Sequence, residues 1–343
     1  IAVDDPTAVT ARVFRTQNAL LVADGAMPAD VEAPIRRGAM LSVPIMWATP
    51  KGGVPLGVVN LSGRRGGQPF TASDQKLVSA IATQVGTTIQ NTRLVRASLE
   101  QERMTHEMLL AHDLQMKLLP PADALLPDAT CAARVAPAES VGGDFYNLFR
   151  LGPGQVGVMI GDVSSHGYRA ALIMALVMSA TAIHARGSAD PAATVGALLA
   201  SLADELRETE MFLTVCYAVV DSTAGTITWC NAGHPHAFVV RGDGSAMRLG
   251  ATDPPLGLVD DAPHATSRAW HADDLLVLFT DGISDARDAA KKRLGEAPVL
   301  EVVKARRADA PWRIVDGVFA LVEGHMGAVP PRDDQALVVL RTN

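Results

Sequence analysis

Hydrophobic and polar positions in the first 70 residues alternate over short runs that are separated by Gly and Pro. The run LSVPIMWA at 41–48, the KGG turn at 51–53 and the run PLGVVNLSG have the pattern of two strands joined by a tight turn. This stretch of the chain therefore predicts a β-hairpin.

A helical period replaces the strand pattern after the hairpin. Thr71 and Asp74 form a start similar to a capping box, and apolar residues then recur at helical spacing. No Pro follows until Pro120, so the helix is expected to continue to Leu119. The apolar seam thins over 100–107 and then resumes. Two copies of such a helix are expected to pair as a coiled coil, which predicts a dimer.

Strand-like runs return from about residue 130 and continue almost to the end of the chain. Helical patterns interrupt them at 168–186, at 191–207, where Asp190 is the expected cap, and near 298–324. Because short turns join most consecutive strands, the sheets are expected to be antiparallel, and the pattern predicts an α+β fold. The expected strands are CAARVAPA, DFYNLFRL, QVGVMIGDV, FLTVCYAVV, TITWCNAG, HAFVVRG, DLLVLFTD and QALVVLR.

Four short acidic motifs punctuate these strands. A lone Asp beside Gly is usually a turn former, but here each carboxylate is expected where a buried strand ends and a turn begins. Carboxylates brought together repel one another and require a positive partner. No His or Cys is interleaved at ligand spacing, so the oxygen donors predict Mg²⁺ or Mn²⁺ rather than zinc. The motifs are GGDFYN (Asp144), IGDVSSHG (Asp162), LFTDGISD (Asp281) and RDDQALVVL (Asp333, Asp334).

The composition is that of a folded protein of about two domains. The chain has 343 residues, of which 48% are hydrophobic and 20% charged. Its 37 acidic and 30 basic residues give a net charge of −7, and no dense Lys/Arg block occurs. This balance argues against a nucleic-acid partner.

Cysteine usage and hydropathy bear on the compartment. Cys131, Cys216 and Cys230 are too few and too irregularly spaced for a disulfide framework, and they suit a reducing cytoplasm. The longest apolar stretch, 170–185, is shorter than the ~20 residues of a membrane span, so we expect a buried core helix and no membrane association. The first residues lack a signal pattern and read as the interior of a longer protein. A cytoplasmic location is therefore expected.

Other catalytic patterns fail on their context. Gly152, Gly154 and Gly157 have the spacing of a dinucleotide-binding loop, but a strand rather than a helix follows them, which predicts a hairpin turn. The sequence has no GxSxG motif, Walker loop or Cys-x5-Arg phosphate loop. The acidic set is thus the site with enough parts for chemistry.

The motifs resemble those of the bacterial PPM-type, metal-dependent serine/threonine phosphatases related to the sporulation phosphatase SpoIIE. The likeness spans 130–341, where VGGDFYN, IGDVSSHG, NAGHP, PPLGL, LFTDGISDAR and DDQALVVLR occur in family order. Residues 1 to about 95 resemble the C-terminal part of a GAF sensor domain. The resemblance implies an antiparallel β-sandwich flanked by helices (αββα), preceded by a long linker helix and a partial GAF-like α/β domain.

The resemblance also implies the division of the chain. We expect a partial GAF-like sensor domain at 1–90, a helical linker that forms a coiled coil at 91–122, and the phosphatase domain at 123–343. A homodimer through the linker helix and the sensor domain follows from this arrangement.

The family's functional residues map onto this sequence. By resemblance, Asp162 would bridge two Mn²⁺ or Mg²⁺ ions with help from the carbonyl of Val163, and Asp144 would serve one of the ions. Asp281 and Asp333 would complete the other ion, and we count the neighbouring Asp334 in the same metal-binding set. Asp162 and Asp281 are the expected catalytic residues. Two such ions can activate a shared water for in-line attack on a phosphoserine.

The sequence departs from the family at four positions. Asn147 stands where many relatives have Asp, Ser165 where Gly is common, Asp285 where Glu is usual, and Gln335 where an apolar residue follows the Asp pair. None of these changes removes a principal metal ligand.

Four polar residues in or near the motifs have competing interpretations. We expect His234 to support the fold by hydrogen bonding rather than to act as an acid or base, and both roles stay open for His166. Ser164 and the following serine are expected to cap the next helix.

The leading hypothesis is a metal-dependent protein phosphatase that acts on phosphoserine or phosphothreonine of a regulatory protein, under control of the sensor domain. The family's usual substrate is a phosphorylated antagonist of an anti-sigma factor. The alternatives are a catalytically weak partner-switching scaffold, which Asn147 and Gln335 motivate, and a metallohydrolase of small phosphoesters.

Overall fold

The computed structural model describes residues 2–343 except 24–37, 50–51, 166, 186–187 and 260. It divides into two compact units, Ile1–Thr105 and His106–Asn343. The division falls inside one continuous helix, α2 (Ala72–Leu118), and each unit is described here by itself. The predicted boundaries at 90 and 122 stay predictions.

The N-terminal unit contains a three-stranded antiparallel sheet in the order β1-β2-β3. The predicted hairpin is confirmed, because β2 pairs with β3 from Met40 opposite Ser62 to Thr49 opposite Gly52. Residues 50–51 of its turn lie outside the described part of the chain. The elements are α1 (Val9–Thr16), β1 (Leu20–Val22), β2 (Met40–Thr49) and β3 (Gly52–Ser62).

The long helix begins as the sequence predicts. The Thr71 main-chain N–H and hydroxyl both donate to Asp74 Oδ2 at 2.7 Å, and the Asp74 N–H returns a bond of 3.3 Å to Thr71 Oγ1. One face of the helix lies on the sheet, where a Cβ on Gly86 would come within 2.2 Å of the Met46 carbonyl oxygen. Only glycine fits that approach.

The C-terminal unit contains two five-stranded sheets in which all strand pairs are antiparallel. The first sheet has the order β10-β9-β12-β13-β4 and the second β11-β8-β7-β6-β5. The first sheet consists of β4 (Ala129–Ala136), β9 (His236–Val240), β10 (Ala246–Arg248), β12 (Leu275–Phe279) and β13 (Gln335–Thr342). The second consists of β5 (Phe145–Gly152), β6 (Gln155–Val163), β7 (Leu213–Asp221), β8 (Thr226–Ala232) and β11 (Thr266–Ala269).

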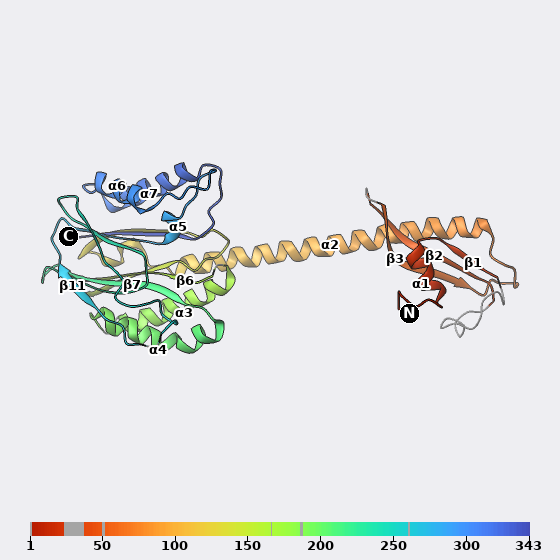
Figure 1. The fold of residues 1–343 in the computed structure, drawn as a ribbon, viewed down its shortest axis with the longest axis horizontal. Helices are drawn as coiled ribbons and strands as arrows, with labels where there is room; N and C mark the ends of the chain where they lie inside the picture. Colours follow the sequence, from red (N-terminus) through yellow and green to blue (C-terminus); the bar gives the residue numbers. More distant parts are fainter. Residues whose placement is uncertain (1, 24–37, 50–51, 166, 186–187, 260) are drawn as a thin grey trace. The chain divides into compact units, whose positions relative to one another are not determined.

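Helices cover the outer faces of both sheets, which gives the predicted αββα layers (Figure 1). A 3-10 turn, η1 (Ala122–Leu125), and the single turn α5 (Asp281–Ser284) complete the unit. The helices α3 (Tyr168–His184) and α4 (Pro191–Thr209) lie on the second sheet, and α6 (Glu296–Ala305) and α7 (Pro311–Met326) lie on the first.

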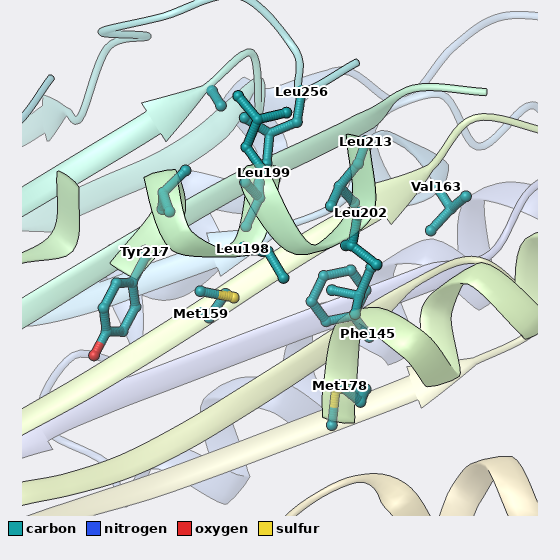
Figure 2. Packing of buried hydrophobic residues seen from close by; sticks show 14 of the residues in the cluster. Phe145, Met159, Val163, Met178, Leu198, Leu199, Leu202, Leu213, Tyr217 and Leu256 are labelled. Atoms are coloured by element: carbon teal, nitrogen blue, oxygen red, sulfur yellow. The ribbon is translucent and has the colours of Figure 1, made fainter. Parts of the chain in front are cut away.

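Apolar side chains fill each interlayer space. Between α3, α4 and the second sheet, the rings of Phe145 and Tyr217 and the side chains of Met159, Leu198 and Leu202 form one buried cluster (Figure 2). A second cluster lies between the two sheets and a third under α6 and α7. The three cysteines are buried and free.

The helix α3 matches the expectation of a buried core helix on one face only. Its inner face is buried, but Tyr168, Leu172, Leu176 and Ile183 are 45–72% exposed on the outer face. Its apolar sequence gave no sign of which face would be covered. In the part of the chain that the structure describes, no helix is long and apolar enough to cross a membrane.

Candidate metal centre

The acidic motifs meet at one edge of the sandwich because the strands are antiparallel. Asp162 lies near the end of β6, and Asp281 follows β12 and begins α5. Asp144 instead immediately precedes β5, and Asp333 and Asp334 precede β13. The expectation that each carboxylate follows a strand is thus wrong for two of the four motifs. Starts and ends of antiparallel strands share an edge, so the motifs still converge.

Asp144 is held by a residue of the opposite sheet. The Thr280 hydroxyl donates to Asp144 Oδ2 at 2.6 Å and accepts from the Ala336 N–H at 2.9 Å. Both Thr280 and Asp144 are buried. The contact fixes the carboxylate of the second sheet to the strand ends of the first.

Asp334 organises the loop that carries Asp144. Its Oδ1 accepts from the Ala138 N–H at 2.8 Å, and its Oδ2 accepts from the Gly143 N–H at 2.7 Å. A Cβ on Gly142 would lie 2.1 Å from Asp334 Oδ2, so the carboxylate packs directly on the glycine pair. With both oxygens engaged by the main chain, Asp334 supports the loop, and its ligand role stays a prediction.

The predicted carbonyl ligand lies at the same loop. A Cβ on Gly143 would lie 2.9 Å from the Val163 carbonyl oxygen and 3.4 Å from Asp162 Oδ1. The glycine therefore allows the Asp144 loop to approach both predicted donors of β6. The four acidic motifs and Val163 are thus brought together as predicted.

The carboxylates raise one another's pKa. Burial, and then the negative charge of Asp162, raise the pKa of Asp144 well above its usual value. Burial and the charges of Asp281, Asp333 and Asp334 raise the pKa of Asp162 to about 8. Burial and Asp333 also raise the pKa of Asp281. A divalent cation would supply countercharge to these carboxylates in their ionised form.

The donor set fits a hard cation. The side chains that converge are carboxylates, with the Val163 carbonyl beside them, and oxygen donors of this kind suit Mg²⁺ and Mn²⁺. Within the described residues, no three His, Cys, Asp or Glu side chains already form a group able to hold an ion. The carboxylates would therefore have to draw closer around a bound ion.

His234 has the structural role that we expected. It is buried, its Nε2 lies 3.1 Å from the Phe279 carbonyl oxygen, and its N–H donates to Asn231 Oδ1 at 2.7 Å. Burial lowers its pKa to about 3, so the ring is neutral at physiological pH. His166 lies outside the described residues.

The expected caps of α3 are wrong. The Ser164 hydroxyl accepts from the Phe212 N–H at 2.8 Å, and α3 begins at Tyr168 with Gly167 as its N-cap residue and no side-chain cap. Ser165 has a φ of 84°, the left-handed region that glycine occupies without strain. That conformation explains why the family favours glycine there.

Two other departures, Asn147 and Gln335, line cavities. Asn147 lines a cavity of about 270 Å³ with Pro120 and Leu151, and its Oδ1 accepts from the Leu148 N–H at 3.0 Å. Gln335 is buried, with Nε2 3.8 Å from the Met326 sulfur.

Sequence reasoning missed three supporting residues. Thr280 lies within the LFTDGISD motif, but the motif gives no local sign that this residue contacts Asp144. Gln115 on α2 donates from Nε2 to the Gly142 carbonyl oxygen at 2.5 Å and accepts from the Gly142 N–H at 3.1 Å. The Ser284 hydroxyl pairs with His236 Nε2 at 2.8 Å and donates to the Asp281 carbonyl at 3.2 Å. Apart from the Asp281 carbonyl that Ser284 contacts, their partners are distant in sequence.

The αββα sandwich with an acidic centre between strand ends defines a PP2C-type phosphatase domain. The sequence profile described as stage II sporulation protein E (SpoIIE) matches residues 152–343, more than half of the chain. The chain therefore belongs to the SpoIIE family. A GAF domain profile matches residues 2–89.

Curated relatives carry the same likeness. Protein IcfG of Synechocystis sp. is 26% identical over 265 residues, which cover 69% of this chain and 42% of IcfG. Phosphoserine phosphatase RsbP of Bacillus subtilis is 30% identical over 155 residues, 43% of this chain and 38% of RsbP. Phosphoserine phosphatase RsbU of the same bacterium is 25% identical over 249 residues, 70% of this chain and 71% of RsbU. The chain thus spans about two fifths of IcfG and of RsbP.

Solved structures share the fold. The SiaA PP2C domain of Pseudomonas aeruginosa superposes with a TM-score of 0.63 and 20% identity, over 71% of this chain and 99% of that domain. A structure of SpoIIE from Bacillus subtilis, with its PP2C domain and a regulatory fragment, gives a TM-score of 0.56 and 22% identity, over 63% of this chain and 62% of that one.

Proposed function

We propose that this chain is a metal-dependent protein phosphatase that hydrolyses phosphoserine or phosphothreonine on a regulatory protein. One observation carries the proposal. Carboxylates from four strand ends of two sheets gather around the Asp144 loop, and burial and mutual repulsion raise the pKa of Asp144, Asp162 and Asp281, as expected of a site that binds a cation. Family membership supplies the phosphatase class.

Each residue of the candidate metal centre has a separate proposed role. Asp162 Oδ1 lies close to the Asp144 loop, and the charges of Asp281 and Asp333 also act on Asp162. This proximity supports the proposal that Asp162 would serve both of two ions, with help from the Val163 carbonyl. Two bound Mn²⁺ or Mg²⁺ ions would supply a water of lowered pKa and positive charge for the phosphoryl oxygens. Thr280 and Asp334 hold the Asp144 loop in place.

The test is Mn²⁺-dependent hydrolysis of a phosphoserine protein by the full chain. We expect Asp162→Asn and Asp281→Asn each to abolish turnover, because each removes one anionic donor. Asp204→Asn is the matched control, since the Asp204 side chain is 86% exposed on α4. Full activity in both site variants would overturn the proposal.

The substrate class is proposed from the relatives. RsbU and RsbP are named phosphoserine phosphatases, and the family's usual substrate is a small phosphorylated antagonist of an anti-sigma factor. We therefore propose such a protein as substrate. Turnover of the phosphoprotein should exceed that of p-nitrophenyl phosphate in kcat/KM. The reverse order would favour the alternative of a small-phosphoester metallohydrolase.

A weak scaffold is the second alternative. Gln335 and Asn147 motivated it, yet the described geometry keeps the carboxylate set together despite both residues. Titration calorimetry distinguishes the two functions, because a scaffold would bind its partner protein without binding Mn²⁺ at millimolar concentration.

Control by the N-terminal GAF domain is proposed from the continuity of α2. The helix belongs to both units, and Gln115 near its C-terminal end forms two hydrogen bonds to Gly142, which adjoins the Asp144 loop. We expect Gln115→Ala to change kcat without changing the fold of the N-terminal unit, which circular dichroism and turnover together would show.

The same helix supports the proposed homodimer. Val95, Leu99 and Leu109 recur at heptad spacing on one side of α2 and are each at least 56% exposed, although they are large and apolar. Pairing with a second copy would bury them. Leu99→Glu should shift sedimentation equilibrium toward monomer, and Ala97→Glu, on the opposite side of the helix, should not. A wild-type chain that sediments as a monomer at all concentrations would refute the dimer.

A further inference from the structure

A cavity of about 190 Å³ opens beside the candidate metal ligands. Its wall includes Asp333 itself and Gly282, which follows Asp281. Arg287 and Arg332 line the same cavity, with Met326 and Pro330 among the apolar part of the wall. An occupant of this cavity would therefore lie next to the acidic centre and next to two guanidinium groups.

The two arginines lack carboxylate partners. Arg287 Nη1 donates to the Lys291 carbonyl oxygen at 3.2 Å, and no ion pair of Arg287 or Arg332 occurs among the described residues. The one further carboxylate of the wall, Asp285, already pairs with Arg293 at 3.1 Å. Both guanidinium groups thus keep donors for an external acceptor.

An anionic substrate meets an electrostatic obstacle at this centre. Several carboxylates lie close together at the strand ends, and a phosphate monoester carries up to two negative charges, so the two repel each other. Positive side chains beside the site would lower this repulsion, in addition to the metal ions that the carboxylates would bind. A guanidinium group offers a planar fork of donors that matches two oxygens of a phosphoryl group. Arg287 and Arg332 have this chemistry at the required place.

We propose that Arg287 and Arg332 bind the phosphoryl group of the substrate in this cavity, through its non-bridging oxygens. The inference rests on the proposed phosphatase function and adds two substrate-binding residues to it. The ligand class is a phosphate monoester dianion. The recognised feature is the phosphoryl group itself, rather than an acidic side chain that neighbours the phosphoserine.

The first test compares three substrates in the presence of Mn²⁺. These are p-nitrophenyl phosphate, a phosphoserine peptide with neutral flanking residues and one with acidic flanking residues. Arg332→Ala and Arg287→Ala should each raise KM about tenfold for all three, and the Lys variants should restore part of the loss. Arg268→Ala is the control, because Arg268 lies on the edge strand β11 and, among the residues that the structure describes, its side chain bonds only to the Ser267 carbonyl.

Arg332→Ala is the decisive variant, because this replacement is not expected to disturb the fold. Arg332 is exposed and forms no hydrogen bond among the described residues, so its removal leaves the local structure unchanged. Unchanged KM values for all three substrates would overturn the proposal. A rise in KM confined to the peptide with acidic flanking residues would also overturn the proposal, because the arginines would then bind a carboxylate next to the phosphoserine.

A second test does not depend on turnover. Calorimetry with the Mn²⁺-loaded full chain should show inorganic phosphate binding that weakens about tenfold in Arg332→Ala, with Mn²⁺ affinity unchanged. A parallel loss of Mn²⁺ affinity would refute direct phosphoryl binding. If the wild type binds no Mn²⁺ and hydrolyses none of the substrates, the proposed function fails. If the wild type is active and Arg332→Ala equals it in both tests, only this inference fails.

Discussion

The hydroxyl of Thr280 and the carboxylate of Asp144 form a buried hydrogen bond of 2.6 Å between residues 136 positions apart. The same hydroxyl accepts from the Ala336 N–H, so one side chain joins a strand end of each sheet. The bond favours the ionised form of Asp144, although burial outweighs it and raises the pKa of the carboxyl. A threonine outside the ligand set is thus part of the architecture of the centre.

Replacement of this hydroxyl should be costly. Thr280→Val leaves the Ala336 N–H and one Asp144 oxygen without a partner in a buried place, so we expect a loss of about 1–3 kcal/mol in the free energy of unfolding. Mn²⁺ affinity should fall as well, because the Asp144 loop loses its anchor. Urea denaturation of the full chain measures the first effect and calorimetry the second.

Thr228→Val is the matched control, since the Thr228 hydroxyl pairs with Ser267 at an exposed site. Its stability should change by under about 0.5 kcal/mol. Equal effects of the two replacements would contradict the role assigned to Thr280.

The neighbouring Asp333 and Asp334 should behave differently. Asp334→Asn presents an amide N–H₂ to one of two main-chain N–H donors, so we expect a loss of about 1–3 kcal/mol in stability even without metal. Asp333→Asn removes a charge that raises the pKa of Asp281, so the metal-free protein should keep its stability and lose Mn²⁺ affinity. Denaturation with and without Mn²⁺ separates the two effects, and identical behaviour would refute this division.

The metal-free protein should become less stable as pH rises. Burial and neighbouring charges raise the pKa of Asp162 to about 8, whereas the same carboxyl in the unfolded chain titrates near 4. The folded state therefore holds a proton that the unfolded state has released. The associated stability is complete below about pH 4 and is lost as pH rises through about 8, by at most about 1.4 kcal/mol per pH unit for this group.

Urea denaturation in the presence of a chelator between pH 5 and 8.5 measures this slope. Asp162→Asn should flatten the slope and exceed wild type in stability at pH 8, because an amide neither titrates nor repels. Saturating Mn²⁺ should stabilise the wild type at pH 8 more than this variant. A wild-type slope that is zero or positive without metal would contradict the prediction.

The left-handed conformation of Ser165 allows a stabilising replacement. Ser165→Gly removes the Cβ clash at a φ of 84°, and the gain exceeds the added entropy of the unfolded chain, so we expect a rise of about 0.5–1 kcal/mol. Ser179→Gly, within helix α3, should instead lose about 0.5 kcal/mol. Thermal denaturation of both variants checks the opposite signs.

Signals between residues close in sequence predicted most of the fold. The Thr71 and Asp74 pair and the Asp190 and Pro191 pair mark the starts of α2 and α4, because a cap involves only residues within one turn. The short edge strand β11 was missed, since its TSRA sequence lacks an apolar alternation.

The sequence predicted which acidic residues lie together, but it did not predict the residues that support them, and the ligand roles stay predictions. Order and strand context identified Asp144, Asp162 and Asp281, and the structure brings them together. The bond from Thr280 and the double contact of Gln115 join segments far apart in the chain, which a local pattern does not record. The outward face of α3 escaped prediction for a similar reason, because an apolar helix shows its covered side only when its neighbours are in place.

The contact between Gly143 and Asp334 also concerns the order in which the chain folds, since it spans 191 positions. A contact between residues this far apart forms late in folding. The entropy lost when the two residues are brought together is offset only after the strands that lie between them in the sequence have paired. The carboxylates then cannot enclose an ion until β13, the last strand, has joined its sheet. Metal uptake would therefore report completion of the C-terminal unit, and during synthesis it would follow the folding of the N-terminal sheet.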